Sequence, residues 1–129
     1  MTPNKAIEIV DRLKPNSYSE EDKMRWINEL DGMVQSLVIQ ADKITQYSYP
    51  EDMDKELLVP APYDDLYTLF LEAKIDYHNR EYGNYNNSAM MFEAQYSEYK
   101  KDYIRKHQAR GGACAITLSY RGAKPNKKI

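Results

Sequence analysis

Tyrosines recur through EYGNYNNSAMMFEAQYSEYKKDY, residues 81–103. A phenol ring can stack on a nucleic-acid base, and its hydroxyl can transfer a proton in catalysis. The spacing here alternates between four and three residues, which places one stripe along a helix: Tyr85, Ala89, Phe92, Tyr96, Tyr99 and Tyr103. Base-stacking platforms usually lie on sheets or barrels with interleaved basic residues, whereas acidic residues are as frequent as lysines here. We therefore predict that Tyr85, Phe92, Tyr96, Tyr99 and Tyr103 pack against a neighbouring helix or another subunit.

Other residues that could carry chemistry are few. His78 and His107 are the only histidines, and neither lies at a spacing that would suggest a catalytic triad, so we expect both on exposed helix surface. Cys114 follows two glycines without an activating neighbour. The acids in DMDKE, residues 52–56, resemble the start of a calcium loop, but leucine and tyrosine stand where such a loop needs glycine and glutamate. The sequence predicts no enzyme, no metal and no cofactor.

The composition suits one helical domain with an arm. The chain has 129 residues, 42% of them apolar and 29% charged, which favours a globular protein with a modest core. No apolar run reaches the roughly 18–20 residues of a membrane span, and the first residues do not resemble a secretory signal. A single cysteine excludes an internal disulfide.

Charge is distributed unevenly along the chain. Residues 105–129 contain seven of the 18 Lys/Arg and no Asp/Glu, which leaves eleven basic and all 20 acidic residues in 1–104. An acidic body with a basic tail suggests two surfaces with different partners.

Apolar periodicity predicts an all-α fold of about four helices. Their expected ranges are 3–13, about 19–43, about 62–81 and 86–108, with Ser19 as an N-cap and a proline-containing connector between the second and third. The expected core-facing positions are Ala6, Ile9, Val10, Leu13, Met24, Ile27, Leu30, Val34, Leu37, Val38, Ala41, Leu66, Leu69, Phe70, Ala73 and Tyr77.

Two shorter features complete the prediction. ELLVP, residues 56–60, has the character of a short extended segment, and Gly83 with its asparagines suggests a turn. We expect residues 1–108 to form the helical bundle and residues 109–129 a basic C-terminal arm with a short strand-like stretch.

The segment LLVPAPYDDLYTLFLEAKIDYHNREYGNYNNSAMMFEAQYSEYKKDY, residues 57–103, resembles a known family. Its pattern Pro-x-Pro-Tyr-Asp-Asp-x-Tyr, followed by Asp-Tyr and Tyr-x-x-Tyr-Asn-Asn-Ser, is similar to that of head–tail connector, or adaptor, proteins of tailed phages and prophages. These residues cover nearly two fifths of the chain, and the N-terminal helices agree only in layout. The motif contains no chemical group that would anchor the match.

The resemblance implies a virion protein assembled in the host bacterial cytoplasm. It implies a ring, commonly of twelve copies, that attaches beneath the portal protein, extends the DNA channel and receives tail or stopper proteins. DNA would pass through without sequence-specific binding, and an acidic wall suits this because like charge weakens phosphate adhesion. The arm would dock on the portal, and the residues expected to do so are Arg110, Ile116, Leu118, Tyr120, Arg121 and Lys124.

A second class of function stays open. The basic tail also suits a small helical interaction module that binds nucleic acid. Self-association through the helices favours the ring, whereas DNA affinity that falls steeply with salt favours the alternative.

Overall fold

The computed structural model describes the backbone of residues 1–111 and the side chains of residues 1–107. This part of the chain is helical, with α1 (Pro3–Leu13), α2 (Glu20–Met33), the π-helical segment η1 (Val34–Ile39), α3 (Asp65–His78) and α4 (Tyr82–Gly111), and it contains no strand. The predicted all-α class is confirmed. ELLVP forms no strand, and the predicted arm lies outside the described residues except for the last turn of α4.

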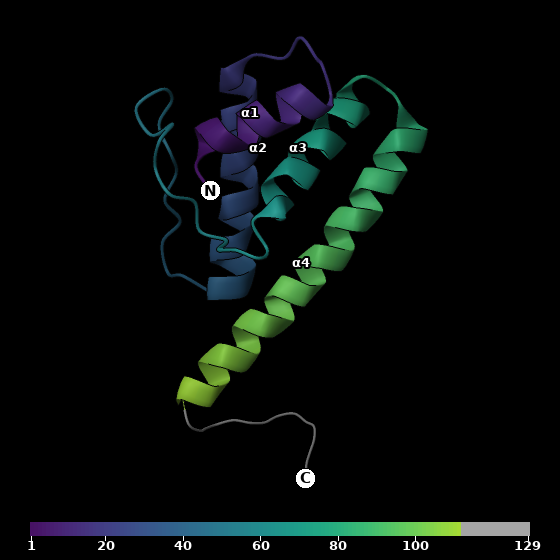
Figure 1. Ribbon diagram of the computed structural model, residues 1–129. Coiled ribbons are helices and arrows are strands. Elements are labelled where there is room, and N and C mark those ends of the chain that lie inside the picture. The colour runs from purple at the N-terminus through teal and green to yellow at the C-terminus, as the bar shows by residue number, and fades with distance from the viewer. Residues whose placement is uncertain (112–129) are drawn as a thin grey trace. The chain divides into compact units, whose positions relative to one another are not determined.

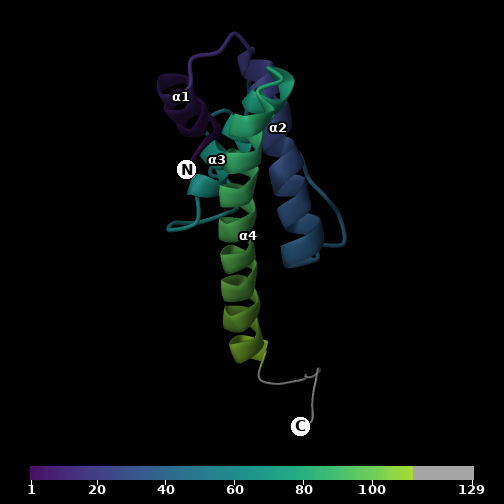
Figure 2. The same ribbon diagram turned by 90° about the vertical axis from the view of Figure 1, so that its right-hand side faces the viewer.

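The chain forms two compact units, the first of residues Met1–Ser97 and the second beginning at Glu98. The predicted boundary at residue 108 stays a prediction. In the first unit, α2, α3 and the initial turns of α4 run alternately up and down, and α1 lies across the start of α2 and the end of α3 (Figures 1 and 2).

Local signals at the helix ends explain where α1 and α2 begin. Thr2 Oγ1 accepts a hydrogen bond from the Lys5 N–H, and Pro3 occupies the first turn, where its missing N–H has no cost. Ser19 Oγ accepts from the Asp22 N–H at 3.0 Å, which confirms the predicted N-cap. Three acidic residues in the first turn of α2 face the positive end of its dipole.

The second helix ends earlier than predicted, and its last six residues are π-helical. Val34–Ile39 is π-helical, and Gln40, with φ of 60°, stops the helix at residue 39 and not near 43. A π-helical turn contains more residues than an α-helical turn, so Val38 stays on the face of Val34 while Leu37 turns away from it. Val38 is buried, but Leu37 is 52% exposed, and its predicted place in the core is wrong.

The other helix boundaries and faces also need correction. Helix α3 begins at Asp65, three residues later than predicted, and a turn at 79–81, with Arg80 at φ of 61°, lets α4 begin at Tyr82. The predicted turn at Gly83 and its asparagines is therefore wrong: Gly83 is inside α4, which begins four residues before the predicted start at residue 86. Three further positions predicted to face the core, Leu13, Ala41 and Tyr77, are exposed, and Ile9, Leu69 and Phe70 are only half-buried.

The core of the first unit is apolar and is shared by all three N-terminal helices. Fully buried side chains come from α1, α2, η1, α3 and the connector: Ala6, Val10, Met24, Ile27, Leu30, Val34, Val59, Leu66, Tyr67, Leu71 and Ile75. Each removes its apolar surface from water, which is the main stabilising contribution in a domain of this size.

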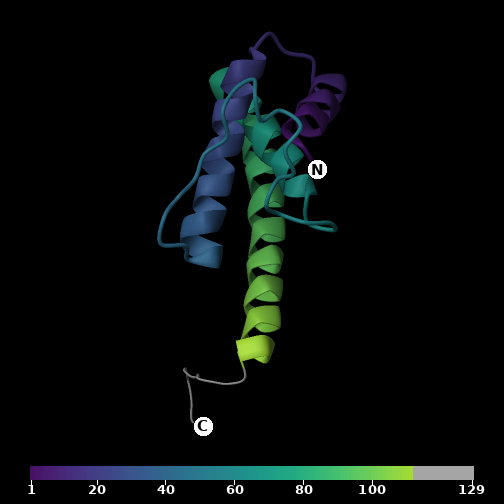
Figure 3. The ribbon, with the colours of Figure 1, turned by 90° about the vertical axis from the view of Figure 1, so that its left-hand side faces the viewer.

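The connector, residues 40–64, runs back along α2 before it returns to the start of α3 (Figures 1 and 3). Side-chain amides of α2 and η1 hold its first part: Asn28 bonds both backbone groups of Tyr47, and Gln35 bonds both of Thr45. Its later part is held by the N-terminus, because the Leu57 N–H donates to Met1 O and the Asn4 N–H to Met53 O. These bonds order a long segment that has no regular structure.

Candidate interaction surface

The first turns of α4 are fixed on α3 by a buried carboxylate. Asp76 is fully buried, lies 2.9 Å from Lys14 Nζ at the end of α1, and accepts a hydrogen bond from Ser88 Oγ at 3.2 Å. The contact with Asp76 raises the pKa of the Lys14 ammonium above its ordinary 10.5. One buried carboxylate thus joins α1, α3 and α4.

The inward face of α4 carries the first part of the tyrosine stripe. Phe92 is buried, and Tyr85, Ala89 and Tyr96 are half-buried. The ring of Phe92 lies 5.3 Å from that of Phe70 and 5.6 Å from that of Tyr96, and Tyr85 lies 5.4 Å from Tyr77. Phe92 and Tyr85 of the stripe therefore contact α3, and Tyr96 stacks on Phe92 within α4.

A groove remains between these helices. It has a volume of about 500 Å³ and is lined by Phe70, Ala73 and Tyr77 of α3 and by Tyr85, Ala89 and Phe92 of α4. Met33 of α2, Lys74 of α3 and Glu93 of α4 also line it. We call this the α3–α4 groove. Its wall contains four aromatic rings, so it can accept an apolar side chain without providing chemistry of its own.

The opposite face of α4 is also apolar at its centre. Met90 is 71% exposed, Met91 is 60% exposed, and Ala94 one turn further is exposed as well. We call these three residues the methionine ridge. Exposed single apolar residues are common, but adjacent flexible methionines on one helix are typical of surfaces that bind a partner.

The second unit continues the stripe on its own part of α4. Tyr99 is buried and Tyr103 half-buried, with their rings 6.2 Å apart, and Tyr103 stacks on His107 at 3.8 Å. Asp102 pairs with Arg105 and Lys106, and both contacts hold the pKa of this carboxyl below its usual range. His107 is exposed, as predicted, and its Nδ1 lies 2.9 Å from the carbonyl oxygen of Tyr103.

The residues predicted to dock on the portal cannot be placed. Ile116, Leu118, Tyr120, Arg121 and Lys124 lie outside the described residues, as does Cys114, and only the backbone of Arg110 is described. Their predicted role stays a prediction.

A second hollow lies beside α2, with a volume of about 670 Å³. His78 stacks on Trp26 here at 5.4 Å, so it is a packing residue as well as an exposed one. Four of the five charged residues around the hollow form ion pairs, Lys74 with Glu29 and Arg25 with Asp22, and the fifth is Glu21. The two ion pairs are on the surface and offset most of the charge around the hollow.

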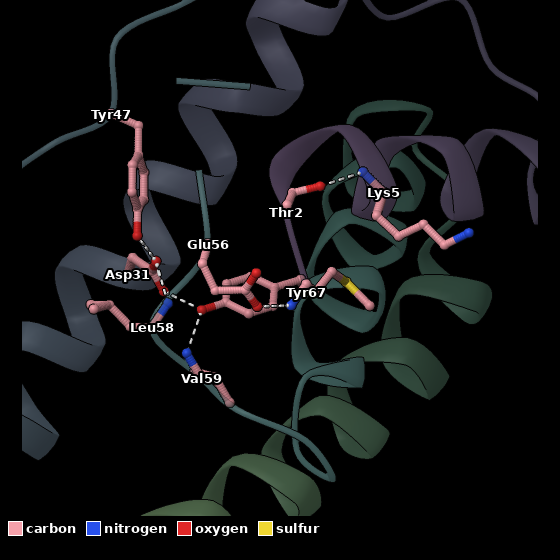
Figure 4. Close-up of polar contacts among 9 residues, drawn as sticks. Thr2, Lys5, Asp31, Tyr47, Glu56, Leu58, Val59 and Tyr67 are labelled. Atoms are coloured by element: carbon pink, nitrogen blue, oxygen red, sulfur yellow. Dashed lines mark hydrogen bonds and ion pairs between the residues drawn. The ribbon is translucent and has the colours of Figure 1, made fainter. Parts of the chain in front are cut away.

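A buried carboxylate that the sequence patterns did not indicate lies between α2 and the connector (Figure 4). Asp31 accepts hydrogen bonds from the hydroxyls of Tyr47 and Tyr67 and from the Leu58 N–H, and the Tyr67 hydroxyl also accepts from the Val59 N–H at 2.8 Å. Burial raises the pKa of Asp31, and burial together with Asp31 raises the pKa of both tyrosines. The hydroxyls are therefore protonated donors near neutral pH, which suits a structural clamp.

The described residues hold no group of three or more His, Cys, Asp or Glu that could bind a metal ion. In the segment 52–56, Asp52 accepts from the Ser48 N–H, Asp54 from Asn4 Nδ2, and Glu56 pairs with the N-terminal amine. These acids anchor the connector and the chain terminus.

Comparison with known proteins finds no matching family model, no matching curated protein and no matching solved structure. Within the part of the chain that the structure describes, none of the helices is both long and apolar enough to cross a bilayer.

Proposed function

We propose that this chain is a structural protein of a phage virion, a head–tail connector that assembles as a ring beneath the portal. In this role it extends the DNA channel, receives the tail, and has no catalytic centre and no cofactor. The observation that carries the proposal is the pair of apolar surfaces on α4, the α3–α4 groove and the methionine ridge, in a chain whose residues 57–103 resemble connector proteins. Exposed apolar surface of this kind favours association with another protein.

The charge distribution supports the same role. Residues 1–104 carry eleven Lys/Arg against 20 Asp/Glu, so the body repels phosphate and suits a channel through which DNA must slide. Residues 105–129 are basic, which suits docking on an acidic surface of the portal.

A second function is favoured by that same basic segment, namely a small helical module that binds nucleic acid. Phosphate contacts made by Lys and Arg release counterions, so such binding weakens steeply as salt is raised. The two functions therefore differ in partner and in salt dependence.

Binding to portal rings and to DNA, measured in parallel at increasing salt, tests the proposal. We expect the full-length chain to sediment with portal rings and to show only weak DNA binding at physiological salt. DNA binding with a steep salt dependence, together with no binding to portal rings, would exclude the head–tail connector function and favour the nucleic-acid-binding module.

A further inference from the structure

We propose that the methionine ridge of one copy inserts into the α3–α4 groove of a second copy, so that the subunits join head to tail. This inference rests on the proposed ring function and specifies the contact that builds the ring. It is drawn from residues of the first unit alone.

The ridge and the groove match in chemistry. Methionine side chains are flexible and make favourable contacts between their sulfur and aromatic rings. The groove is lined by the rings of Phe70, Tyr77, Tyr85 and Phe92 in a volume of about 500 Å³, and on the ridge Met90 and Met91 are largely exposed to solvent. The same molecule thus carries both a flexible apolar ridge and an aromatic groove that could receive it.

The charge pattern shows where a second copy could approach. Residues 1–104 are strongly acidic, so two copies repel each other over most of their surfaces. Residues 82–92 contain no charged side chain, and they include both methionines as well as Tyr85, Ala89 and Phe92 of the groove. Contact through this uncharged stretch lets two acidic bodies approach with the least repulsion.

The geometry makes the contact heterologous. Ala89 lines the groove, and the next residue, Met90, lies on another face because successive residues of an α-helix are rotated by about 100°. A copy cannot place its ridge in its own groove, and each copy keeps one free ridge and one free groove after the first contact. Contacts of this type generate a ring when the rotation closes.

Two variants block one side each. Met90→Lys/Met91→Lys charges the ridge and leaves the groove intact, whereas Ala89→Lys places a long side chain in the groove and leaves both methionines in place. Lysine is a good helix former, so α4 should be retained in both. The matched control is Leu13→Lys/Ile44→Lys, which charges two other exposed apolar residues. If circular dichroism shows that Ala89→Lys does not fold, Tyr77→Lys at the exposed edge of the groove takes its place.

Analytical ultracentrifugation of the full chain gives the readout. We expect each variant to lose self-association by at least about tenfold, as for a residue at the centre of an interface, while the control assembles as the wild type does. An equimolar mixture of the ridge and groove variants should form a dimer and nothing larger, because only one intact ridge and one intact groove can meet.

Three results would overturn the inference, and they differ in whether the proposed ring function would still stand. Wild-type-like assembly of either variant excludes the ridge-in-groove contact and leaves the ring function standing. If the ridge variant and the groove variant stay monomeric both alone and when mixed, the ridge-in-groove contact is also excluded. In the mixture, the intact groove of one variant would then fail to bind the intact ridge of the other. A wild-type chain that stays monomeric at high micromolar concentration and does not bind portal rings removes both the inference and the proposed function.

Discussion

The hydroxyl of Tyr67 in α3 donates a hydrogen bond of 2.6 Å to Oδ1 of Asp31 in α2, while it accepts one from the Val59 N–H of the connector. Three segments that are distant in sequence therefore depend on one oxygen atom. Tyr67→Phe keeps the ring in the core but leaves the Val59 N–H and Asp31 Oδ1 without this partner. We expect a loss of about 1–3 kcal/mol in the free energy of unfolding, measured in urea. Tyr82→Phe, on an exposed ring, is the control and should stay within about 0.5 kcal/mol of the wild type.

The pH dependence of stability reports on Asp31 itself. Burial raises the pKa of Asp31 above 3.8, although the hydrogen bonds from Tyr47, Tyr67 and Leu58 oppose this shift. Between the unfolded and folded pKa values the folded state binds a proton that the unfolded state lacks, so the contribution of Asp31 is greatest in acid and is lost as pH rises through the folded pKa. The stability advantage of the wild type over Asp31→Asn should therefore shrink from about pH 4 to pH 7. An advantage that grows with pH would mean that the three donors outweigh burial.

Two leucines in the same helical run give a matched test of the core. Leu30 is fully buried in α2, whereas Leu37 in η1 is half exposed. We expect Leu30→Ala to cost about 2–5 kcal/mol of unfolding free energy. Leu37→Ala should change it by less than about 1 kcal/mol, since an exposed side chain leaves no cavity. Equal losses in chemical denaturation would show that η1 is packed differently in solution.

The C-terminal segment is expected to serve a partner and not the fold. Deleting residues 109–129 removes five of the seven basic residues after Ile104: Arg110, Arg121, Lys124, Lys127 and Lys128. We expect the truncated chain to keep its helical circular dichroism signal and melting temperature but to lose co-sedimentation with portal rings. Binding to portal as strong as that of the full-length chain would exclude a docking role for this segment.

Much of the fold follows from local sequence patterns. The Ser19 cap, the range of α1 and the all-α class depend on signals within a few residues, so periodicity and capping predicted them. The face of Leu37 was predicted wrongly because Leu30, Val34, Leu37 and Val38 fit an α-helical stripe, whereas Val34–Ile39 is π-helical. Nothing in the spacing of the apolar residues indicates the change from α-helical to π-helical geometry at Val34.

The candidate interaction surface was only partly predictable. Helical spacing identified Tyr85, Phe92 and Tyr96 as one face, but the contacts of Phe92 with Phe70 and of Tyr85 with Tyr77 depend on how α4 packs against α3. The clamp at Asp31 joins residues 16 and 36 positions apart, and the stacking of His78 on Trp26 joins α3 to α2. Such contacts come from tertiary packing, which a single sequence does not specify at this level.

The particle formed by the purified full-length chain tests the central claim most directly. Sedimentation velocity gives its mass, and negative-stain electron microscopy shows whether that mass is a closed ring. We expect a single large species that appears as rings with a central opening, and we expect it to disappear in the Met90→Lys/Met91→Lys variant. The claim would be contradicted if the chain sediments as a monomer at every concentration and also fails to assemble into rings when portal rings are present.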